Sequence, residues 1–431
     1  MKTVTVHTLG CKVNYSETAQ LVDKFEELGY TIKEFGEQSD IILINTCSVT
    51  NNADVEARKI IRRAKRKSPN AFLGVLGCYA QLKPDEVAQI EGVDGVFGQR
   101  EKFMIPSLIH QYMNGDMTQI NVSCIEDLPF EPAVTTDSES RTRAFLKLQD
   151  GCNYFCSFCT IPNARGRSRS IDIAHIPRQL EKVVNAGYKE VVISGINLGD
   201  YKSKNGENFI DLVKLISQSE QNLRVRISSV EPNLVKDEII DIVHSSDKFC
   251  KHFHIPLQSG SKEILRKMKR RYRPEQYKEL VYKIKDKIPN CGIGVDVIVG
   301  FPGETDEYFI ETFDLLNELP ISYLHVFTYS ERDNTPAIKF PNPVKIEERK
   351  RRTNILRDLS FAKKQEFYAQ QIGKLLTVIP ESFNESEGQW KSWSDNYVRV
   401  KFPADKSLKK DFTKILITSS DDEFAYGTIF K

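Results

Sequence analysis

Three closely spaced cysteines stand in the middle of the chain, in the segment DGCNYFCSFCTIP. Cys152, Cys156 and Cys159 have the spacing CxxxCxxC and come just after a run that is typical of a strand. Three thiolates on one loop can hold three irons of a 4Fe-4S cluster, which leaves the fourth iron open to a substrate. A structural zinc site would need four ligands, usually as paired CxxC units, and no second pair follows. The spacing therefore favours a cluster with one open iron.

Three more cysteines lie far apart in the sequence but share one structural position. Cys11, Cys47 and Cys78 each come directly after an apolar run, in VTVHTLGC, IILINTC and FLGVLGC. Because ligands gather at the carboxyl ends of parallel strands, neighbouring strands can bring these thiolates into one crevice. Ordinary burial of cysteine at strand ends explains the positions equally well. A second three-cysteine cluster is therefore a hypothesis, and the remaining cysteines are assigned to packing: Cys124, Cys250 and Cys291.

The elements that must position the N-terminal cysteines have the pattern of a parallel α/β sheet. Short apolar runs alternate, up to about residue 126, with segments whose apolar residues have helical spacing. The runs predict strands over residues 4–8, 41–45 and 72–76, and helices over residues 16–28 and 53–67. Residues 127–142, which are rich in Pro, Ser, Thr and acidic side chains, are predicted to be a linker.

The middle and the end of the chain predict two further domains. Six strand-like runs, each separated from the next by enough residues for a helix, cover residues 144–148, 190–194, 223–228, 252–257, 294–299 and 323–328. Repeated βα units imply a parallel barrel or a partial one, with chemistry at the C-terminal strand ends. We therefore expect an α/β protein with an open parallel α/β domain (1–126), a partial βα barrel (143–365) that ends in a long amphipathic helix, and a small β-barrel (366–431).

Composition limits the classes of protein that remain. The chain has 431 residues, of which 40% are hydrophobic and 28% charged, as in ordinary globular proteins. No stretch approaches the roughly 18 apolar residues of a membrane span, and the start of the chain has the pattern of a strand rather than a signal peptide. Nine cysteines fit a reducing compartment, so we expect a cytoplasmic protein without a membrane partner. With a net charge of +2, contacts to nucleic acid must come from local basic stretches, such as residues 58–67 and 262–273.

The cysteine loop and its place after a strand resemble the signature of the radical S-adenosylmethionine (SAM) superfamily. The resemblance implies that SAM binds the open iron and is cleaved by an electron from the cluster to a 5'-deoxyadenosyl radical. The residues that it implies near SAM lie beside the cysteines and at successive strand ends: Phe158, Ser194, Gly195, Asn197, Ser229, Gln258, Ser259, Val299 and Gly300. Taken singly, such Gly and Ser residues are usually turn residues. Their recurrence at consecutive strand ends favours cofactor binding.

A narrower resemblance is carried by the strings TLGCKVNYSET, CTIPNARGRSRS, SSVEP, HIPLQSGS, MKRRYR and DVIVGFPGET. Together with the three-domain order, they resemble the radical SAM methylthiotransferases, most closely the branch that acts on N6-threonylcarbamoyladenosine in tRNA. This implies transfer of a methylthio group to C2 of that base at position 37, next to the anticodon, with two 4Fe-4S clusters and SAM as cofactors. The C-terminal segment, residues 366–431, resembles a TRAM domain, a small β-barrel that binds RNA. The implied partners are the tRNA anticodon stem-loop, an electron donor such as a flavodoxin or ferredoxin, and a sulfur donor.

Glu231, an acid at the end of the third barrel strand, is expected to face the substrate as a catalytic residue. His252 and His254 lie on one face of a strand, and we expect them to pack or hydrogen-bond rather than bind a metal. Two other functions stay open. One is a radical SAM methylthiotransferase for another tRNA adenosine or for a ribosomal protein. The other is a non-catalytic, cluster-containing RNA-binding protein whose basic stretches contact phosphates.

Overall fold

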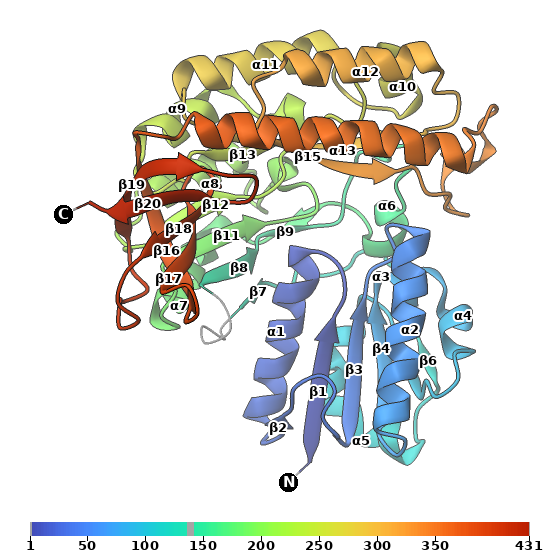
Figure 1. Cartoon of the computed structure of the whole chain (residues 1–431). Helices are drawn as coiled ribbons and strands as arrows, with labels where there is room; N and C mark the ends of the chain where they lie inside the picture. The colour runs from blue at the N-terminus through green and yellow to red at the C-terminus, as the bar shows by residue number, and fades with distance from the viewer. Residues whose placement is uncertain (1, 136–141, 431) are drawn as a thin grey trace.

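The computed structural model describes residues 2–135 and 142–430, and three β structures follow one another along this chain (Figure 1). An open parallel sheet comes first, a partial barrel of parallel strands second, and a closed barrel of mostly antiparallel strands last. The expected fold class is confirmed. No helix in the described part of the chain combines the length and the apolar character that crossing a membrane requires.

The N-terminal domain is a doubly wound parallel sheet. In spatial order its strands are β2 (Thr31–Ile32), β1 (Thr3–Thr8), β3 (Ile41–Thr46), β4 (Phe72–Gly77), β5 (Gly95–Phe97) and β6 (Ile120–Asn121). β3 and β4 are buried throughout because helices cover both faces of the sheet. The apolar stripes of α1 (Lys12–Glu27) and α5 (Ile105–Asn114) cover one face. The other face carries α2 (Asn51–Lys67), α3 (Cys78–Leu82) and α4 (Pro84–Ala88).

The predicted strands of this domain are confirmed, but its first helix starts earlier than predicted. α1 begins at Lys12, whereas apolar spacing predicted a start at Ser16. Apart from Val13, the side chains that the first turns bury are polar, among them Asn14 and Glu17. Hydrophobic periodicity therefore gives no signal for these turns.

The central domain is a partial barrel, as predicted. Its six parallel strands are β8 (Arg143–Lys147), β11 (Glu190–Ser194), β12 (Arg224–Ile227), β13 (His252–His254), β14 (Gly292–Val299) and β15 (Tyr323–Thr328). Two bridges, Val225 to Phe249 and Ser229 to His254, join the β12 side to the β13 side. β13 ends at His254, before the predicted residue 257, although the N–H groups of Ile255 and Leu257 still donate to carbonyls of β14.

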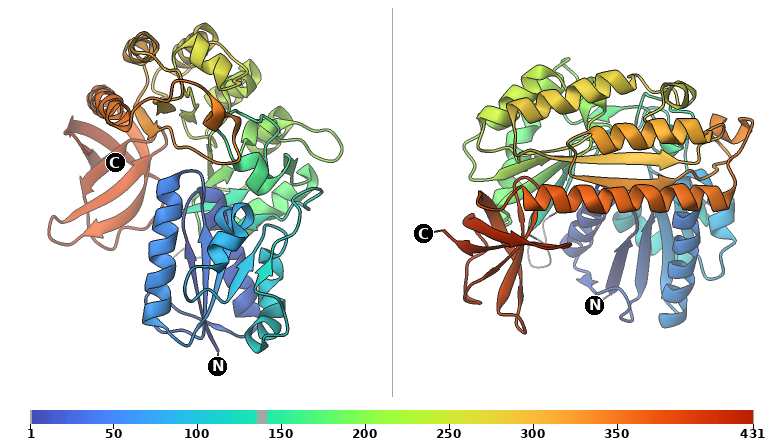
Figure 2. Two further views of the ribbon diagram at one scale, coloured as in Figure 1. Left: turned by 90° about the vertical axis from the view of Figure 1, so that its right-hand side faces the viewer. Right: turned by 45° about the horizontal axis from the view of Figure 1, so that its top comes forward.

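Helices cover the outside of the partial barrel (Figure 2). They are α7 (Ile176–Asn185), α8 (Phe209–Ser217), α9 (Asp237–Ser245), α10 (Lys262–Lys267), α11 (Pro274–Lys287), α12 (Asp306–Glu318) and α13 (Ile346–Ala369). The long helix α13 packs along β15 and reaches the C-terminal barrel, where it contacts β19 (Thr413–Ser420). The helix predicted over residues 345–370 is therefore confirmed, and it connects the two domains.

The C-terminal barrel closes in the order β16 (Leu375–Asn384), β17 (Gln389–Ser394), β18 (Arg399–Pro403), β20 (Ala425–Ile429) and β19. Apolar runs predict strands of this barrel over residues 375–379, 397–402, 415–418 and 427–430, but none predicts β17. The β17 segment is mostly polar, although Trp390 from it is buried in the barrel core. Within the predicted linker 127–142, the short strand β7 (Ala133–Val134) pairs antiparallel with β8. Residues 136–141 of that linker lie outside the described residues.

A buried ionic network joins the N-terminal domain to the partial barrel. Glu17 of α1 is fully buried, and its carboxylate accepts from Lys102 (2.7 Å), Lys147 of β8 (3.0 Å) and Arg165 (3.0 and 3.1 Å). Arg165 also donates to Asp150 at 3.0 Å. Burial alone would raise the pKa of Glu17, but Arg165, Lys102 and Lys147 hold this pKa well below its ordinary range. Glu17 is therefore an ionised group at the centre of the domain interface.

Replacing this carboxylate tests its role in the interface. In Glu17→Gln, Arg165, Lys102 and Lys147 lose their common anion, so we expect the free energy of unfolding to fall by about 3–5 kcal/mol. The measurement is urea unfolding followed by circular dichroism. Glu27→Gln, on the exposed end of the same helix, is the matched control, and it should change stability by no more than about 0.5 kcal/mol. Equal unfolding midpoints for the two variants would contradict the assignment.

Candidate cluster and cofactor site

The central cysteines lie on the loop between β9 (Gln149–Asp150) and α6 (Ile161–Arg165), at the carboxyl end of the barrel strands. The Sγ of Cys152 accepts from the Tyr154 N–H at 3.4 Å, and the Sγ of Cys156 accepts from Nη1 of Arg270 at 3.1 Å. The N–H of Cys159 donates to the carbonyl of Cys156 at 3.0 Å. Two of the three sulfur atoms therefore already receive hydrogen bonds of the kind that stabilise cluster thiolates.

The electrostatics of these cysteines fit a metal cluster. Burial, together with neighbouring cysteines of the loop, raises the pKa of Cys159 to about 12 and that of Cys152 to about 11. Burial also raises the pKa of Cys156, which Arg270 partly counteracts. Crowded thiols of this kind are neutral when free, and a bound metal centre compensates the thiolate charge. The loop thus suits three ligands to one cluster.

The N-terminal cysteines meet at the carboxyl edge of their sheet. Cys11 follows β1, Cys47 follows β3 and Cys78 follows β4, and these three strands are neighbours. The gap between β1 and β3 is the switch point of the strand order, where ligands gather in open α/β sheets. Burial, together with Cys78 and Cys11, raises the pKa of Cys47 to about 12. The three thiols are therefore close enough to interact.

Gly10 packs closely against Cys47 at the carboxyl edge of the N-terminal sheet. Gly10 has φ +107°, and a Cβ added there would lie 2.6 Å from Cβ of Cys47. Both the backbone conformation and the space therefore require glycine before Cys11. Burial raises the pKa of Cys78, and the nearby cations Arg165 and Lys102 counteract this rise. This donor set suits an anionic metal-thiolate centre.

A cavity of about 220 Å³ lies between the two cysteine sets. Cys159 and Phe158 line it from the cysteine loop, and Val49 and Thr50 line it from the loop after Cys47. Further lining residues come from the carboxyl halves of the last barrel strands and the loops after them: Gln258, Asp296, Ile298, Phe327, Thr328, Tyr329 and Ser330. The cavity therefore joins the domain interface to the barrel interior.

Among the residues predicted to bind SAM, Phe158 and Gln258 line this cavity. Asn197 is buried, and neither polar atom of its side-chain amide has a partner among the described residues. An unpaired buried amide costs free energy unless a ligand satisfies it. Asn197 therefore fits a position beside a polar cofactor group.

Three other residues that were predicted to bind SAM have side chains that bond to, or pack against, the protein itself. The Ser194 hydroxyl donates to the Leu146 carbonyl at 3.1 Å, and the Ser259 hydroxyl lies 3.3 Å from that of Thr312. Val299 is fully buried in the barrel core. These three residues can offer a cofactor only their backbone groups, and their contact with SAM stays a prediction.

The two glycines of the prediction lie close to protein side chains. A Cβ on Gly195 would lie 2.7 Å from Oε1 of Gln149, and this oxygen accepts from the Asn197 N–H. Gly300 has φ +77° and lies against the side chain of Arg349. The predicted contact of Gly195 and Gly300 with SAM stays a prediction.

Glu231 and Ser229, at the end of β12, contact polar partners beside the site. Glu231 forms an ion pair with Arg270, the residue that donates to Cys156. Ser229 Oγ lies 2.6 Å from Nδ1 of His254. Glu231 therefore acts on the cysteine loop through Arg270, as a positioning residue. Its predicted contact with the substrate stays untested.

Several residues of the site carried no signal in the sequence. Arg270 lies in the basic string MKRRYR, where a solvated surface was as good an explanation. Arg165 lies in CTIPNAR, yet it is fully buried and bonds to Glu17, 148 positions away. Asp296 and His325 are single polar residues within apolar strands. Side chains alternate along a strand, so Asp296 lies on the same face as Ile298, and His325 lies on the same face as Phe327. Ile298 and Phe327 line the cavity.

Comparison with known proteins gives two family matches. The "Radical SAM superfamily" model matches residues 146–316, and the "Uncharacterized protein family UPF0004" model matches residues 3–98. These spans contain the central and the N-terminal cysteine sets, respectively. Radical SAM proteins hold a 4Fe-4S cluster and use SAM.

Curated relatives align along nearly the whole chain. Threonylcarbamoyladenosine tRNA methylthiotransferase MtaB of Bacillus subtilis (strain 168) is 40% identical, over 99% of this chain and 96% of that protein. The MtaB protein of Aquifex aeolicus (strain VF5) is 37% identical, over 96% of this chain and 100% of the other. A tRNA-2-methylthio-N(6)-dimethylallyladenosine synthase of Fusobacterium nucleatum is 33% identical, over 100% of both chains.

Among solved structures, the radical SAM methyltransferase TsrM from Kitasatospora setae, with cobalamin and a [4Fe-4S] cluster bound, is similar with a TM-score of 0.59. The alignment covers 78% of this chain and 77% of that chain at 17% sequence identity. At this identity the likeness shows a shared fold.

The contact from Glu231 through Arg270 to Cys156 gives a prediction about cluster retention. In Glu231→Gln the ion pair that holds Arg270 against the sulfur is lost, so we expect iron to be lost to a chelator about 10–100-fold faster. The measurement is anaerobic transfer of iron to a coloured chelator from the reconstituted protein. Glu238→Gln, at an exposed position of α9, is the control and should behave as the wild type does. Equal rates for Glu231→Gln and the wild type would remove Glu231 from the site.

Proposed function

The chain belongs to the radical SAM methylthiotransferase family, and from this we propose that it transfers a methylthio group to C2 of N6-threonylcarbamoyladenosine at position 37, next to the tRNA anticodon. The observation that carries the proposal is the single cavity that Cys159 and the loop after Cys47 line together. Relatives that bear this activity in their names align with the chain from end to end.

The reaction explains why this site needs a cluster. The hydrogen on adenine C2 is neither acidic nor a leaving group, so acid-base catalysis alone gives no route to a C–S bond. The cluster and SAM, when bound, supply the one-electron chemistry that such a C–H bond requires. Cys152, Cys156 and Cys159 would hold this cluster, and Arg270 would stabilise the Cys156 thiolate.

The side chains of the cavity have the remaining tasks of binding and orientation. Phe158, Ile298 and Phe327 offer apolar surface on which rings can stack, and Gln258 and Asp296 add polar groups. Enclosure between two domains keeps water away from reactive species. Asn197 is placed to satisfy a polar group of SAM, because its amide has no partner in the described part of the chain.

We assign a second 4Fe-4S cluster to Cys11, Cys47 and Cys78, as the platform from which sulfur is transferred. Support comes from the meeting of these thiols at the switch point of the sheet and from Arg165 and Lys102, which favour negative charge at Cys78. The sulfur donor and the electron donor, a flavodoxin or ferredoxin, are partners of the same proposal.

The tRNA partner is supported by exposed cations and by the last domain. On α2, the exposed side chains include Lys59, Arg62, Arg63, Arg66 and Lys67. Such a face contacts phosphates without selecting a sequence. We assign the closed C-terminal barrel to RNA binding as a TRAM-like domain, and we place the protein in the cytoplasm.

N6-dimethylallyladenosine is the second candidate substrate, because a relative of 33% identity is named for it. The difference lies in the group on N6, which is polar and anionic in one nucleoside and apolar in the other. A ribosomal protein substrate and a non-catalytic RNA-binding role are weaker alternatives, since the relatives above are named as enzymes of tRNA.

Nucleoside analysis tests the reaction and the substrate together. The chain is expressed in a host that makes both N6-modified adenosines but lacks the methylthio derivatives, and digested tRNA is analysed by mass spectrometry. We expect the methylthio derivative of N6-threonylcarbamoyladenosine, and none with Cys156→Ala. A methylthio group on N6-dimethylallyladenosine alone would change the substrate. Unmodified tRNA from protein with loaded clusters would refute the proposed function.

Iron content tests the second cluster. Anaerobically reconstituted protein should hold about eight irons per chain, since each 4Fe-4S cluster contains four. The triple variant Cys11→Ala, Cys47→Ala, Cys78→Ala should hold about four, while Cys124→Ala, the matched control, should keep the full content. Unchanged iron in the triple variant would disprove the N-terminal cluster.

A further inference from the structure

The central cysteine loop carries an aromatic side chain that faces solvent. Phe155 lies between the buried residues Tyr154 and Cys156, yet it is 47% exposed. Its backbone has φ +49°, in the left-handed region that residues with bulky side chains rarely adopt. Such a conformation persists only where the surrounding structure imposes it, and it is concentrated at functional sites. Phe155 is therefore held outward at a cost, which packing of the loop does not explain.

The basic string MKRRYR, residues 268–273, is bonded to the same loop. The Ser157 N–H donates to the carbonyl of Met268 at 3.1 Å. Nη2 of Arg271 donates to the carbonyl of Asn153 at 3.1 Å. The string therefore lies against the cysteine loop and brings its cations close to it.

Two exposed arginines lie over aromatic rings of the loop. The guanidinium carbon of Arg167 is 5.8 Å from the ring centroid of Phe155, and that of Arg271 is 3.9 Å from the ring centroid of Tyr154. Contact with a ring helps to hold each charge in place. Neither arginine forms an ion pair in the part of the chain that the structure describes. The loop thus presents one apolar ring beside two positive charges that lack a carboxylate partner.

Phe155 and Arg167 also line a depression of about 600 Å³. Glu126 and Asp127, which precede the linker, line it as well. Among the described residues, this depression shares no lining residue with the cavity beside Cys159. The cysteine loop therefore contributes to two separate spaces, and Phe155 belongs to the one outside the cavity.

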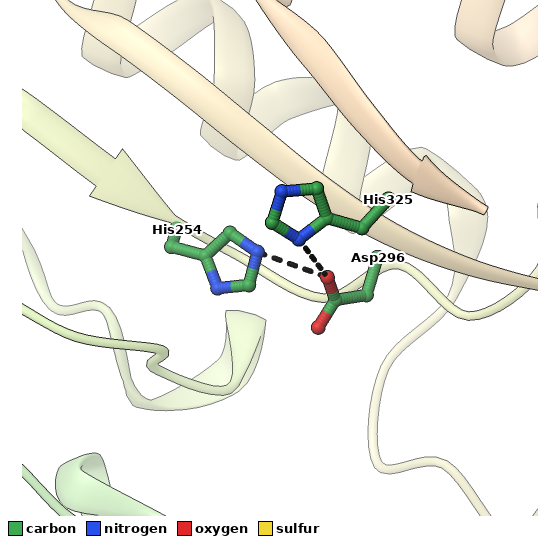
Figure 3. A group of neighbouring side chains, drawn as sticks. All are labelled: His254, Asp296 and His325. Atoms are coloured by element: carbon green, nitrogen blue, oxygen red, sulfur yellow. Dashed lines mark ion pairs between the residues drawn. The ribbon is translucent and has the colours of Figure 1, made fainter. Parts of the chain in front are cut away.

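The cavity side of the loop is not open to a second protein. Asp296 lines the cavity and is paired with histidines of the two neighbouring strands (Figure 3). Nε2 of His254 lies 2.9 Å from Oδ1 of Asp296, and Nδ1 of His325 lies 3.4 Å from the same oxygen. A space of about 220 Å³ with such walls admits small groups only. The side that a protein can reach is the one where Phe155 lies.

We propose that Phe155, Arg167 and Arg271 form the docking surface for an acidic electron-carrier protein, a flavodoxin or ferredoxin, which reduces the cluster on the central cysteine loop. The inference deepens the proposed function and rests on one part of it, the cluster of the central cysteines. The step moves one electron: the reduced centre of the carrier loses it and the cluster gains it, and no bond forms or breaks. Because Phe155 adjoins Cys156 in the chain, a carrier on this ring lies next to a cluster ligand.

Charge complementarity identifies the kind of partner. Arginines without a carboxylate partner attract an acidic surface over long range and speed its encounter with the chain. Redox encounters need only small interfaces, below about 1,200 Å², so one ring and two charges are a sufficient centre. Glu126 and Asp127 would repel the same acidic surface. The carrier is therefore expected on the cysteine-loop side of the depression.

RNA is the competing occupant of this surface. A phosphate is also an anion, and a base can stack on an exposed aromatic ring. The position of Phe155 beside Cys156 favours the electron carrier, because closeness to a cluster ligand shortens the path of an electron but contributes nothing to RNA binding. The exposed cations of α2 offer phosphates a separate face.

Binding of oxidised carriers tests the surface without turnover. Oxidised flavodoxin and oxidised ferredoxin, each with a fluorescent label, are titrated anaerobically with the full chain holding loaded clusters, at low and at high salt. In Arg167→Glu we expect binding at least about 10-fold weaker than in the wild type and less sensitive to salt. Phe155→Gly should also weaken binding about 10-fold, as for loss of an aromatic anchor. Glycine adopts φ +49° without strain, so this variant keeps the loop conformation, and Phe155→Tyr should bind as the wild type does.

Electron delivery gives a second measurement. Formation of 5'-deoxyadenosine from SAM, without tRNA, is followed with the reduced carrier and separately with dithionite, a small reductant that needs no docking surface. The rate with the carrier should fall about 10-fold in Arg167→Glu and in Phe155→Gly. The rate with dithionite should stay at the wild-type value. Iron content is measured for each variant, so a lost cluster is not mistaken for lost docking.

Arg178→Glu, at an exposed position of α7, is the matched control and should leave carrier binding unchanged. A wild type that binds neither carrier, or carrier binding that is unchanged in Arg167→Glu and Phe155→Gly, overturns the inference. Weaker binding of an anticodon stem-loop RNA by these variants, with carrier binding unchanged, overturns it in favour of an RNA contact. Failure of the proposed function would appear separately, as absence of the methylthio nucleoside from protein that cleaves SAM with both reductants.

Discussion

One buried carboxylate, Glu17, determines how the two cysteine sets stand relative to each other. It lies in the second turn of the helix that begins directly after Cys11, and its partner Arg165 lies at the end of the short helix that follows Cys159. An ionised group in a dry interface is tolerated only when its partners are all in place. A shift of either domain would separate Glu17 from Lys147 and Arg165, so the interface has one favourable arrangement. The cavity between the cysteine sets is a consequence of this constraint.

The same network carries an excess of positive charge toward the N-terminal cysteines. Its cations are Lys102, Lys147, Arg165 and Arg169, and its anions are Glu17 and Asp150. Cys78 and Cys11 are among the groups that stabilise the charge of Arg165, and Arg165 in turn lowers the pKa of Cys78. Burial lowers the pKa of Lys102 to about 8, which shows how little solvent reaches this charge. Thiolates at the sheet edge would balance the excess, so domain docking and cluster binding depend on one set of charges.

The sequence predicted those helices and strands whose apolar residues repeat with the period of the element. The principal strands and α13 emerged because buried faces repeat with the period of the element, and the three cysteines of the N-terminal set stand where such runs end. The same reasoning missed the first turns of α1, where Asn14 and Glu17 are buried polar residues, and it missed β17. Contacts such as that of Glu17 with Arg165 join residues that are far apart in the chain. The sequence around a single charged residue is the same whether that residue lies on the surface or in a buried ion pair. The site therefore became visible from the cysteines but not from the residues that hold and surround them.

The C-terminal barrel is coupled to the cavity by the same kind of interaction. Arg226 of β12 bonds to the buried Glu190 and donates to the carbonyls of Asp395 and Ser394 in the last barrel. Although burial alone would raise it, Arg224 and Arg226 hold the pKa of Glu190 at about 2, so this pair stays charged. Arg226 also lowers the pKa of His252 on β13, as does burial, which has the larger effect. One arginine thus contributes both to the docking of the C-terminal barrel and to the electrostatic field inside the central barrel. A change that loosens the C-terminal barrel therefore also alters the field at His252.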